Sequence, residues 1–336
     1  MLLSENVGPG ESSDQNGNAS GLSVSEGLEF KLNEDEMSDA VSGIGSCTDT
    51  DIVIPAEYDG LPVTSIGDWA FGKCSRLTNI TIPSSVMSIG EGAFYDCENL
   101  TNITVPDSMT SIGDNAFSGC RSLTGITIPN GVTSIGCSTF FDCKNLTNIT
   151  IPSGVTSIES YAFCYCENLT NIAVPSGVTS IGDQAFSDCD GLVQITVEKG
   201  NPIYHSARNC LIETESKTLI AGCKNSTIPS DGSVTSIGNN AFSGRISLIG
   251  ITIPNGVTSI GSSAFESCSN LTDITVPNSV TSIGDLAFKC CENLATITFK
   301  GTEEQWDAIE KEDAWDVLAG NSTSSGTYTI VFSPEK

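Results

Sequence analysis

The chain has 336 residues, and its 41 acidic side chains outnumber the 14 basic ones, which gives a formal charge of −27 with a single histidine. A surface this negative repels phosphate groups, so nucleic acid and anionic membranes are disfavoured as partners. The sequence has no apolar run long enough to span a bilayer, so we predict no direct membrane insertion. Its opening residues, MLLSENVGPG, lack the basic and apolar regions of a signal peptide, so none is predicted in this numbering.

The first part of the chain precedes any regular pattern. Residues 1–27 are polar and rich in Gly and Ser, which predicts a disordered leader or linker. From Leu28 the sequence alternates apolar and polar residues in the runs LEFKLN, AVSGIG and DIVIP, a pattern typical of short strands. A stack of repeats needs a cover for its first coil, so we interpret residues 28–65 as an N-terminal cap.

A repeating unit of 23 residues dominates the rest, with the form LTNITIPSSVMSIGEGAFYDCEN. Its Phe keeps the same repeat position nine times, at Phe71, Phe94, Phe117, Phe140, Phe163, Phe186, Phe242, Phe265 and Phe288. A fixed period in the twenties predicts a solenoid, in which each unit buries its apolar face against its neighbours. We assign the regular repeats to residues 66–194 and 236–299.

Every apolar position of the unit has a packing role. Ile80 and Ile82 lie two residues apart, as one face of a strand requires, so we expect both to point inward. Ala93, Phe94 and Cys97 are spaced three or four apart, which predicts one short helical turn on the opposite side of the coil.

Most of the 14 cysteines follow the repeat, because eight share one position: Cys74, Cys97, Cys120, Cys143, Cys166, Cys189, Cys268 and Cys291. Stacked strands lie about 4.8 Å apart, whereas a disulfide needs Cβ atoms about 3.8 Å apart. We therefore predict a ladder of buried free thiols. A linear ladder does not converge on one point, so it predicts no metal site. Cys210 and Cys223 are the strongest disulfide candidates, although buried thiols are preferred there too.

The pattern L-x-x-I-x-I-P-x-x-V-x-x-I-G-x-x-A-F-x-x-C-x-x-L resembles the BspA-like leucine-rich repeat, over about residues 28–333. The resemblance implies a right-handed leucine-rich-repeat solenoid of the α/β type, built mostly from parallel strands and short helical turns. It also implies a bacterial or protozoan protein that is secreted or displayed on the cell surface. Members of the family are associated with adhesion to host proteins or to other cells, but this activity has no residue-level signature.

Between the two groups of repeats the period breaks. From Ile181 to Ile237 the interval is 56 residues, which is two repeats and ten residues more. We interpret residues 195–235 as an irregular variant coil, either a recognition site or a tolerated insertion, and favour the second. Beyond it, Arg245 stands where the ladder expects Cys, so we expect its charged head to reach solvent along its apolar stem.

Residues 300–336 are interpreted as a C-terminal cap with one helix and a final strand. Thr302 followed three residues later by Gln305 forms a capping box, which predicts a helix start. Trp306, Ile309 and Trp315 are then expected to pack on the last coil, and the run TYTIVF predicts the strand. An exposed Trp pair could instead bind sugar rings, but sealing the core is the favoured interpretation.

If the strand isoleucines point inward, the residues beside them form an outward polar face. The candidate binding surface consists of Asn79, Thr81, Asn102, Thr104, Thr127, Asn148, Thr150 and Asn171, with Tyr204, His205 and Arg208 of the variant coil. Gly125, Gly250 and Ala173 interrupt its columns. Acidic residues concentrate instead on the corners and turns, where they promote solubility or form an acidic edge for a basic partner. We expect no catalytic residue, cofactor or metal, because the chain has one histidine and no Gly-rich phosphate loop.

Three hypotheses about function remain. The first is a non-catalytic cell-surface or secreted module that mediates adhesion or protein–protein interaction, with a host-matrix protein or another cell surface as partner. The second is a structural spacer that presents another domain. The third, less favoured, is an ice- or glycan-binding solenoid, for which the threonine columns are the candidate ice-binding rows. We expect a monomer in each case.

Overall fold

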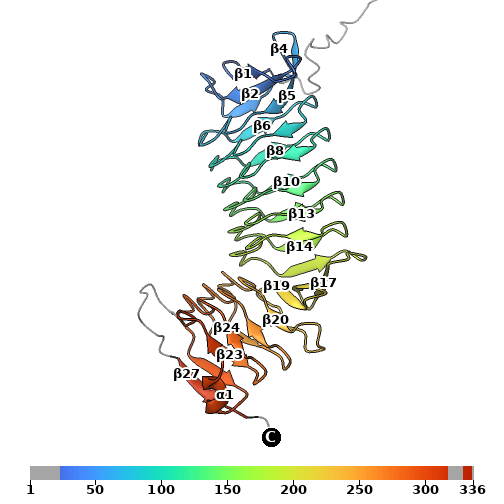
Figure 1. The fold of residues 1–336 in the computed structure, drawn as a ribbon. Coiled ribbons are helices and arrows are strands. Elements are labelled where there is room, and N and C mark those ends of the chain that lie inside the picture. The colour runs from blue at the N-terminus through green and yellow to red at the C-terminus, as the bar shows by residue number, and fades with distance from the viewer. Residues whose placement is uncertain (1–22, 317–327, 335–336) are drawn as a thin grey trace, which may run out of the picture.

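The computed structural model describes residues 23–316 and 328–334. The chain winds as a β-solenoid of about 11 turns, with coils of about 23 residues stacked on one another (Figure 1). This confirms the predicted solenoid, and the coils beyond the nine regular repeats come from the caps and the irregular segment.

One ladder of strands forms what we call the Asn–Thr sheet, because most of its regular coils contribute Asn-Ile-Thr or a close variant. Its parallel pairs are in full register, with Asn79 opposite Asn102 and Thr81 opposite Thr104. The isoleucine between them points into the core, as the two-residue period of a strand requires. The strands are β3 (Asp51–Val53), β6 (Asn79–Thr81), β8 (Asn102–Thr104), β10 (Gly125–Thr127), β12 (Asn148–Thr150), β14 (Asn171–Val174), β16 (Gln194–Val197), β21 (Gly250–Thr252), β23 (Asp273–Val276), β25 (Thr296–Phe299) and β27 (Thr329–Phe332).

A second ladder, the Ser–Ile sheet, lies on another side of each coil. Its first strands form an antiparallel pair, β1 with β2, and the short strand β4 (Glu57–Tyr58) pairs with β5. The later strands pair in parallel, as Ser88–Ile89 does with Ser111–Ile112. The strands are β1 (Glu29–Leu32), β2 (Asp39–Gly43), β5 (Leu61–Ile66), β7 (Ser88–Ile89), β9 (Ser111–Ile112), β11 (Ser134–Ile135), β13 (Ser157–Ile158), β15 (Ser180–Ile181), β20 (Ser236–Ile237), β22 (Ser259–Ile260), β24 (Ser282–Ile283) and β26 (Glu310–Lys311).

The third side of each coil is a pair of tight turns, which we call the turn column, and here the predicted short helical turn is wrong. Gly92 and Asp96 have φ of +56° and +53°, which a right-handed helix does not allow. Backbone N–H groups that a helix would use internally are donated to the next coil instead. The N–H of Phe94 bonds the carbonyl of Ala116 at 2.8 Å, for example. The apolar spacing of three to four residues therefore reflects two consecutive turns.

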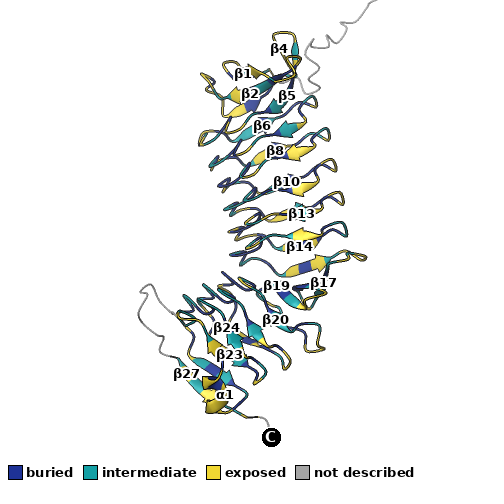
Figure 2. Cartoon of the chain, viewed as in Figure 1, coloured by how far each residue is buried: buried dark blue, intermediate teal, exposed yellow. Residues whose placement is uncertain are grey.

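The core between these three sides is a stack of identical side chains. Figure 2 shows how buried and exposed residues are distributed along the coils. Within each group of regular repeats, the rings of successive Phe residues lie nearly parallel, with centroids 5.2 to 5.8 Å apart. Beside them, the thiol of Cys97 donates to the carbonyl of Phe71 at 3.0 Å, and later ladder cysteines repeat this bond. Burial raises the pKa of Cys97 to about 12, so the thiol stays protonated. All 14 cysteines are free, which confirms the thiol ladder, and Cys210 and Cys223 are unbonded too.

Most of the segment predicted as a disordered leader, residues 1–27, lies outside the described residues, but its last part belongs to the folded cap. Ser25 is buried, and its N–H donates to the carbonyl of Val53 at 3.0 Å. Its hydroxyl also bonds the carboxylate of Asp49 at 2.6 Å. The cap therefore begins before Leu28, because these bonds tie the incoming chain to β3.

The irregular segment forms an antiparallel meander of β17 (Tyr204–Ala207), β18 (Cys210–Glu213) and β19 (Thr218–Gly222). β19 then pairs in parallel with β20, which resumes the Ser–Ile sheet. The stack changes direction where these strands lie (Figure 1). The N–H of Ile181, at the end of the first group of repeats, donates to the hydroxyl of Tyr204 at 3.1 Å. A side chain thus supplies the acceptor at the point where the regular ladder stops.

Arg245 does not reach solvent, contrary to the sequence-based expectation, because it is completely buried. Its guanidinium donates to the carbonyls of Phe186 at 2.8 Å, Gly222 at 2.8 Å and Ser243 at 3.0 Å. In regular coils the thiol of a cysteine at this position donates to the carbonyl of the Phe in the previous coil. For Arg245 the corresponding Phe of the previous regular coil is Phe186. The meander inserts β19 between the coils, and the longer arginine side chain reaches the same carbonyl across it. Arg245 therefore joins the two groups of repeats.

The C-terminal cap contains the only α-helix among residues 23–316 and 328–334, α1 (Glu303–Asp307). The predicted capping box of Thr302 and Gln305 is confirmed, since both of its hydrogen bonds are present. Trp306 is buried and packs edge-on against Phe299 with ring centroids 5.2 Å apart. Trp306 therefore seals the last coil, as the favoured interpretation proposed.

Candidate binding surface

The outer face of the Asn–Thr sheet carries most of the predicted site residues. Asn79 and Thr81, beside the N-terminal cap, are half-buried, and the others on this face are exposed: Asn102, Thr104, Thr127, Asn148, Thr150 and Asn171. Because the strands pair without offset, equivalent side chains stand directly above one another. The structure thus brings these residues together in two polar columns, which Gly125 and Ala173 interrupt.

The asparagine amides of this face already make some hydrogen bonds to neighbouring side chains. Asn102 Nδ2 donates to Asn79 Oδ1 at 3.3 Å, which links neighbouring coils. In a later coil, Asn171 Nδ2 donates to the hydroxyl of Thr170 at 2.9 Å. Each exposed amide still has hydrogen-bonding capacity, because it offers two N–H donors and two acceptor lone pairs. The face can therefore bind a polar partner weakly at each coil.

Gly125 creates a hollow in the asparagine column. It stands between Asn102 and Asn148, and an added Cβ there would meet only the carbonyl of Asn148 at 3.9 Å. The resulting depression has a volume of about 330 Å³ and a floor of Ile103, Ile126 and Ile149. It is the one concave feature that this part of the predicted surface offers among the pockets of the described residues.

The three candidates of the variant coil do not form a common site. Tyr204 is buried, and burial raises the pKa of its phenol while its hydroxyl holds the N–H of Ile181. His205 Nδ1 lies 2.9 Å from the hydroxyl of Thr214. Arg208 has φ of +52° and its carbonyl accepts from a later backbone N–H, so it serves the turn. Tyr204 is therefore a structural residue and is unavailable to a partner.

The acidic edge predicted for the turns is partly neutralised by neighbouring cations. Arg121 contacts Glu98 at 2.8 Å and Asp142 at 2.7 Å, and Lys144 contacts Glu167 at 2.7 Å. Lys144 also lies 3.7 Å from Asp142, so the five groups form one network across four coils. Exposed pairs of this kind contribute only about 0–1 kcal/mol each to stability. Their main effect is to balance charge along this part of the turn column.

Exposed aromatic side chains on the turn column were not identified from the sequence. Trp69, Tyr161 and Tyr165 are 49%, 37% and 41% exposed, and all three have positive φ. Positive φ is uncommon for bulky residues and costs about 1–3 kcal/mol each. The ring of Tyr165 packs edge-on against Phe141 with centroids 5.5 Å apart. Aligning the repeats by position would have shown these rings, because they share columns otherwise held by small or polar residues.

The described residues show neither a metal centre nor a membrane span. No group of three or more His, Cys, Asp or Glu side chains in residues 23–316 and 328–334 is arranged to hold a metal ion. Within the same ranges, no helix has the length and apolar character to cross a bilayer.

The sequence matches a family model described as a BspA-type leucine-rich repeat region, over residues 46–144, 110–231 and 216–309. These overlapping matches extend through most of the chain. The chain belongs to the BspA-type leucine-rich repeat family. The match includes the irregular segment, so the break lies within the family region and is not a foreign domain.

Solved structures of similar proteins support this membership. A leucine-rich cell-surface protein from Faecalibacterium prausnitzii is 29% identical, with a TM-score of 0.55, and the alignment covers 89% of this BspA-type chain and 98% of that protein. Two others share the fold. The pneumococcal vaccine antigen PcpA is 18% identical, has a TM-score of 0.61 and aligns over 93% and 98% of the two chains. A leucine-rich repeat protein from Eubacterium ventriosum is 24% identical, has a TM-score of 0.53 and aligns over 93% and 84%. No curated relative matches the sequence.

The Faecalibacterium prausnitzii relative of this BspA-type chain is therefore a cell-surface protein, and the repeat of the family is typically non-catalytic. In agreement, each apolar column of the repeat is used for packing, and the polar columns lie on open faces. The surfaces available for recognition are the Asn–Thr face and the exposed part of the turn column.

Proposed function

We propose that this chain is a non-catalytic binding module displayed at a cell surface, where its Asn–Thr face adheres to a protein of the host matrix or of another cell. The observation that carries the proposal is the register of that face. Asn102 and Asn171, for example, occupy equivalent positions on strands that stack without offset. A partner with its own repeated polar groups would meet the same contact at each coil.

Repetition supplies affinity that a single coil lacks. Most coils offer an amide, a hydroxyl or both in water, and one such neutral hydrogen bond contributes only about 0.5–1.5 kcal/mol net. Once the first contact forms, the following ones are intramolecular, so linked weak sites can exceed single-site affinity by about 10²–10⁴-fold. The face has few of the Trp, Tyr and Arg side chains that dominate compact hot spots, which favours this distributed mode over one strong contact.

A structural spacer is the second candidate. A stack with sealed ends could hold another domain away from a surface without binding anything itself. The two candidates differ in a direct measurement, because the isolated chain binds a partner in the first case and none in the second.

The test is binding of the purified chain to immobilised extracellular-matrix proteins at low and at physiological salt. Adhesion through the Asn–Thr face predicts binding that survives physiological salt, because neutral hydrogen bonds are not screened. Binding that disappears with salt would instead indicate the acidic groups of the turns. No binding to any matrix protein, by a chain shown to be folded, would contradict adhesion and support the spacer.

Matched variants locate the binding face. Changing Asn102, Asn148 and Asn171 together to Lys should abolish binding, because three cations then stand in the polar column. The control changes Ser111, Ser134 and Ser180 together to Lys, since these exposed residues occupy three coils of the Ser–Ile sheet in the same part of the stack. Equal loss in both variants would contradict recognition by the Asn–Thr face.

A further inference from the structure

Along the turn column, a regular series of backbone hydrogen bonds links each coil to the next. In an intact coil, the N–H of Ser138 donates to the carbonyl of Ser160 at 3.0 Å, and the N–H of Phe140 donates to the carbonyl of Ala162 at 2.9 Å. Alternate N–H groups of this column therefore have an acceptor in the following coil, and those between them bond within their own coil, so that buried backbone donors are satisfied.

At the break two of these bonds are missing. Gln184 and Phe186 occupy the positions of Ser138 and Phe140, and their N–H groups have no backbone acceptor within residues 23–316 and 328–334. The end of β19 lies in the space between the coils. The N–H of Gly222 donates to the carbonyl of Ala241, in the following coil, at 2.8 Å. Two backbone donors of residues beside β19 thus have lost the acceptors that an intact coil provides.

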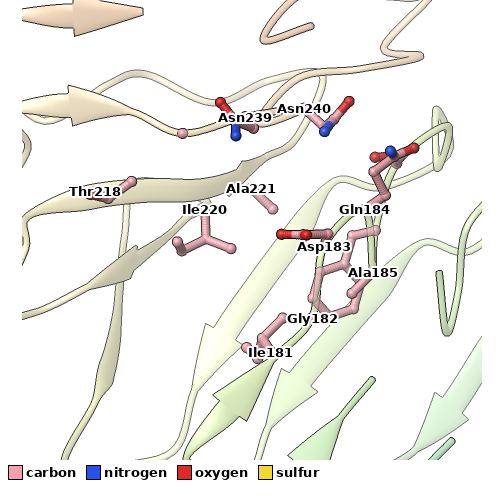
Figure 3. Close-up of a pocket in the computed structure, with 13 residues that line it drawn as sticks. Ile181, Gly182, Asp183, Gln184, Ala185, Thr218, Ile220, Ala221, Asn239 and Asn240 are labelled. Carbon is pink, nitrogen blue, oxygen red and sulfur yellow. The ribbon is translucent and has the colours of Figure 1, made fainter. Parts of the chain in front are cut away.

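A cavity of about 160 Å³ lies at this point (Figure 3). Ser187 lines it, is only 3% exposed, and its hydroxyl oxygen has no hydrogen-bond partner. A buried polar atom of this kind costs about 1–3 kcal/mol when it stays unsatisfied. Three hydrogen-bonding groups of residues that line the cavity therefore lack a partner within the described residues: the hydroxyl of Ser187 and the two N–H groups.

The remaining walls define the chemistry of such a ligand. Asp183, Asn239 and Asn240 line the cavity with a carboxylate and two amides, and Ile181 and Ile220 supply apolar surface. An anion is disfavoured by the carboxylate and by the formal charge of −27. A cation is disfavoured by the N–H donors. A neutral ligand with several hydroxyl groups and apolar C–H faces matches both the polar and the apolar walls.

Size and surroundings narrow the class further. Pockets for drug-sized ligands measure about 300–1,000 Å³, so a cavity of about 160 Å³ suits one small ring. Gln184 Nε2, at the rim, donates to the hydroxyl of Tyr161 at 3.3 Å. The exposed ring of Tyr161 therefore lies next to the rim of the cavity. The negative face of an aromatic ring attracts polarised C–H groups.

We propose that this cavity is a binding site for a neutral carbohydrate and holds one terminal sugar unit. The hydroxyl of Ser187 and the N–H groups of Gln184 and Phe186 bond the oxygens of the sugar. Tyr161 lies where a following unit would leave the cavity. The site is separate from the Asn–Thr face, so it does not depend on the proposed protein adhesion.

The experiment titrates the full chain with methyl glycosides of glucose, galactose, mannose, N-acetylglucosamine and N-acetylgalactosamine, monitored by protein NMR and calorimetry. At least one glycoside should bind saturably at one site. Ser187→Ala should weaken it by about 2- to 12-fold, the equivalent of one net hydrogen bond. This variant should fold normally, because the hydroxyl has no partner to lose. Ser118→Ala is the matched control, since Ser118 holds the same repeat position in an intact coil, and it should leave binding unchanged.

A second variant fills the cavity. Ala221→Leu places a larger side chain in the wall formed by β19 and should abolish binding, with thermal melting measured alongside. If that variant unfolds, Ser187→Ala and its control decide the matter alone. The proposal is overturned if no glycoside binds saturably, if Ser187→Ala leaves binding unchanged, or if a charged small molecule such as acetate or lysine binds and the glycosides do not. Loss of matrix-protein binding with intact sugar binding, or the reverse, separates this proposal from the adhesion proposal.

Discussion

Replacing Arg245 by Met should destabilise the junction between the two groups of repeats. Met has a similar volume and no hydrogen-bond donor. The carbonyl of Phe186 has Arg245 as its only donor among the described residues, and the carbonyl of Gly222 also accepts from the guanidinium. Each unsatisfied buried acceptor costs about 1–3 kcal/mol. We therefore expect a loss of about 3–5 kcal/mol in the free energy of unfolding, which is also the usual cost of breaking a buried charged network.

The loss should fall on one side of the chain first. Coils in a solenoid contact only their neighbours, so a weakened junction uncouples the parts that it joins. The assay is urea unfolding followed by far-UV circular dichroism and tryptophan fluorescence, in which Trp306 and Trp315 report the C-terminal cap. Wild type should lose both signals together, whereas Arg245→Met should lose the cap fluorescence at lower urea than the circular dichroism.

The matched control is Arg121→Met, which removes an arginine from an exposed ion-pair network. Its side chain is 48% exposed, so the expected loss is below about 1 kcal/mol. Arg245→Cys, which restores the residue of the other repeats, should destabilise at least as much as Arg245→Met, because the short thiol leaves a cavity as well. A stability equal to wild type in either Arg245 variant would refute the inference that the arginine joins the repeats.

Three further predictions follow from the core. Burial raises the pKa of the ladder thiols to about 12 at Cys97 and Cys189, so the unfolded chain releases thiol protons first as pH rises. The contribution of the buried thiols to the free energy of unfolding should therefore be complete below about pH 8.5. Above that pH it should fall by about 1.4 kcal/mol per fully buried thiol for each pH unit. A urea midpoint unchanged between pH 7 and pH 10 under reducing conditions would contradict this. Gly222→Ala should prevent normal packing, because its Cβ would lie 2.0 Å from the ring of Phe242, whereas Gly125→Ala should be nearly neutral, as thermal melting can show. Trp306→Ala should cost about 3–5 kcal/mol as a buried aromatic, and no drop in the urea midpoint would argue against its sealing role.

The solenoid could be predicted from the sequence because the same apolar pattern recurs in every repeat. Phe94 alone says little, but its recurrence at a fixed period allows only a stacked arrangement. The geometry of the turn column could not be predicted in the same way. A spacing of three to four residues fits both a helical turn and two consecutive tight turns, and only the positive φ of residues such as Asp96 separates them.

Arg245 was missed for a different physical reason. A lone charge among apolar columns is normally expected to reach water, because an unpaired buried charge is very costly. Its partners are backbone carbonyls left by the irregular segment, and carbonyls have no signature in a sequence. The same reason hid the role of Tyr204, whose hydroxyl completes a backbone bond. A side chain that replaces a backbone hydrogen bond can be recognised only in the three-dimensional structure, whereas repeated side-chain contacts can be predicted from spacing.

The distribution of satisfied and unsatisfied groups at the break also bears on whether the insertion is merely tolerated. An insertion that only had to be accommodated would need each interrupted bond replaced. Tyr204 satisfies the N–H of Ile181, and Arg245 satisfies the carbonyl of Phe186 across β19. The N–H groups of Gln184 and Phe186 and the hydroxyl of Ser187 stay without a partner, and all three belong to residues that line one cavity. Unsatisfied groups gathered around one concave site are expected of a binding site, because its polar groups are satisfied when the ligand is present.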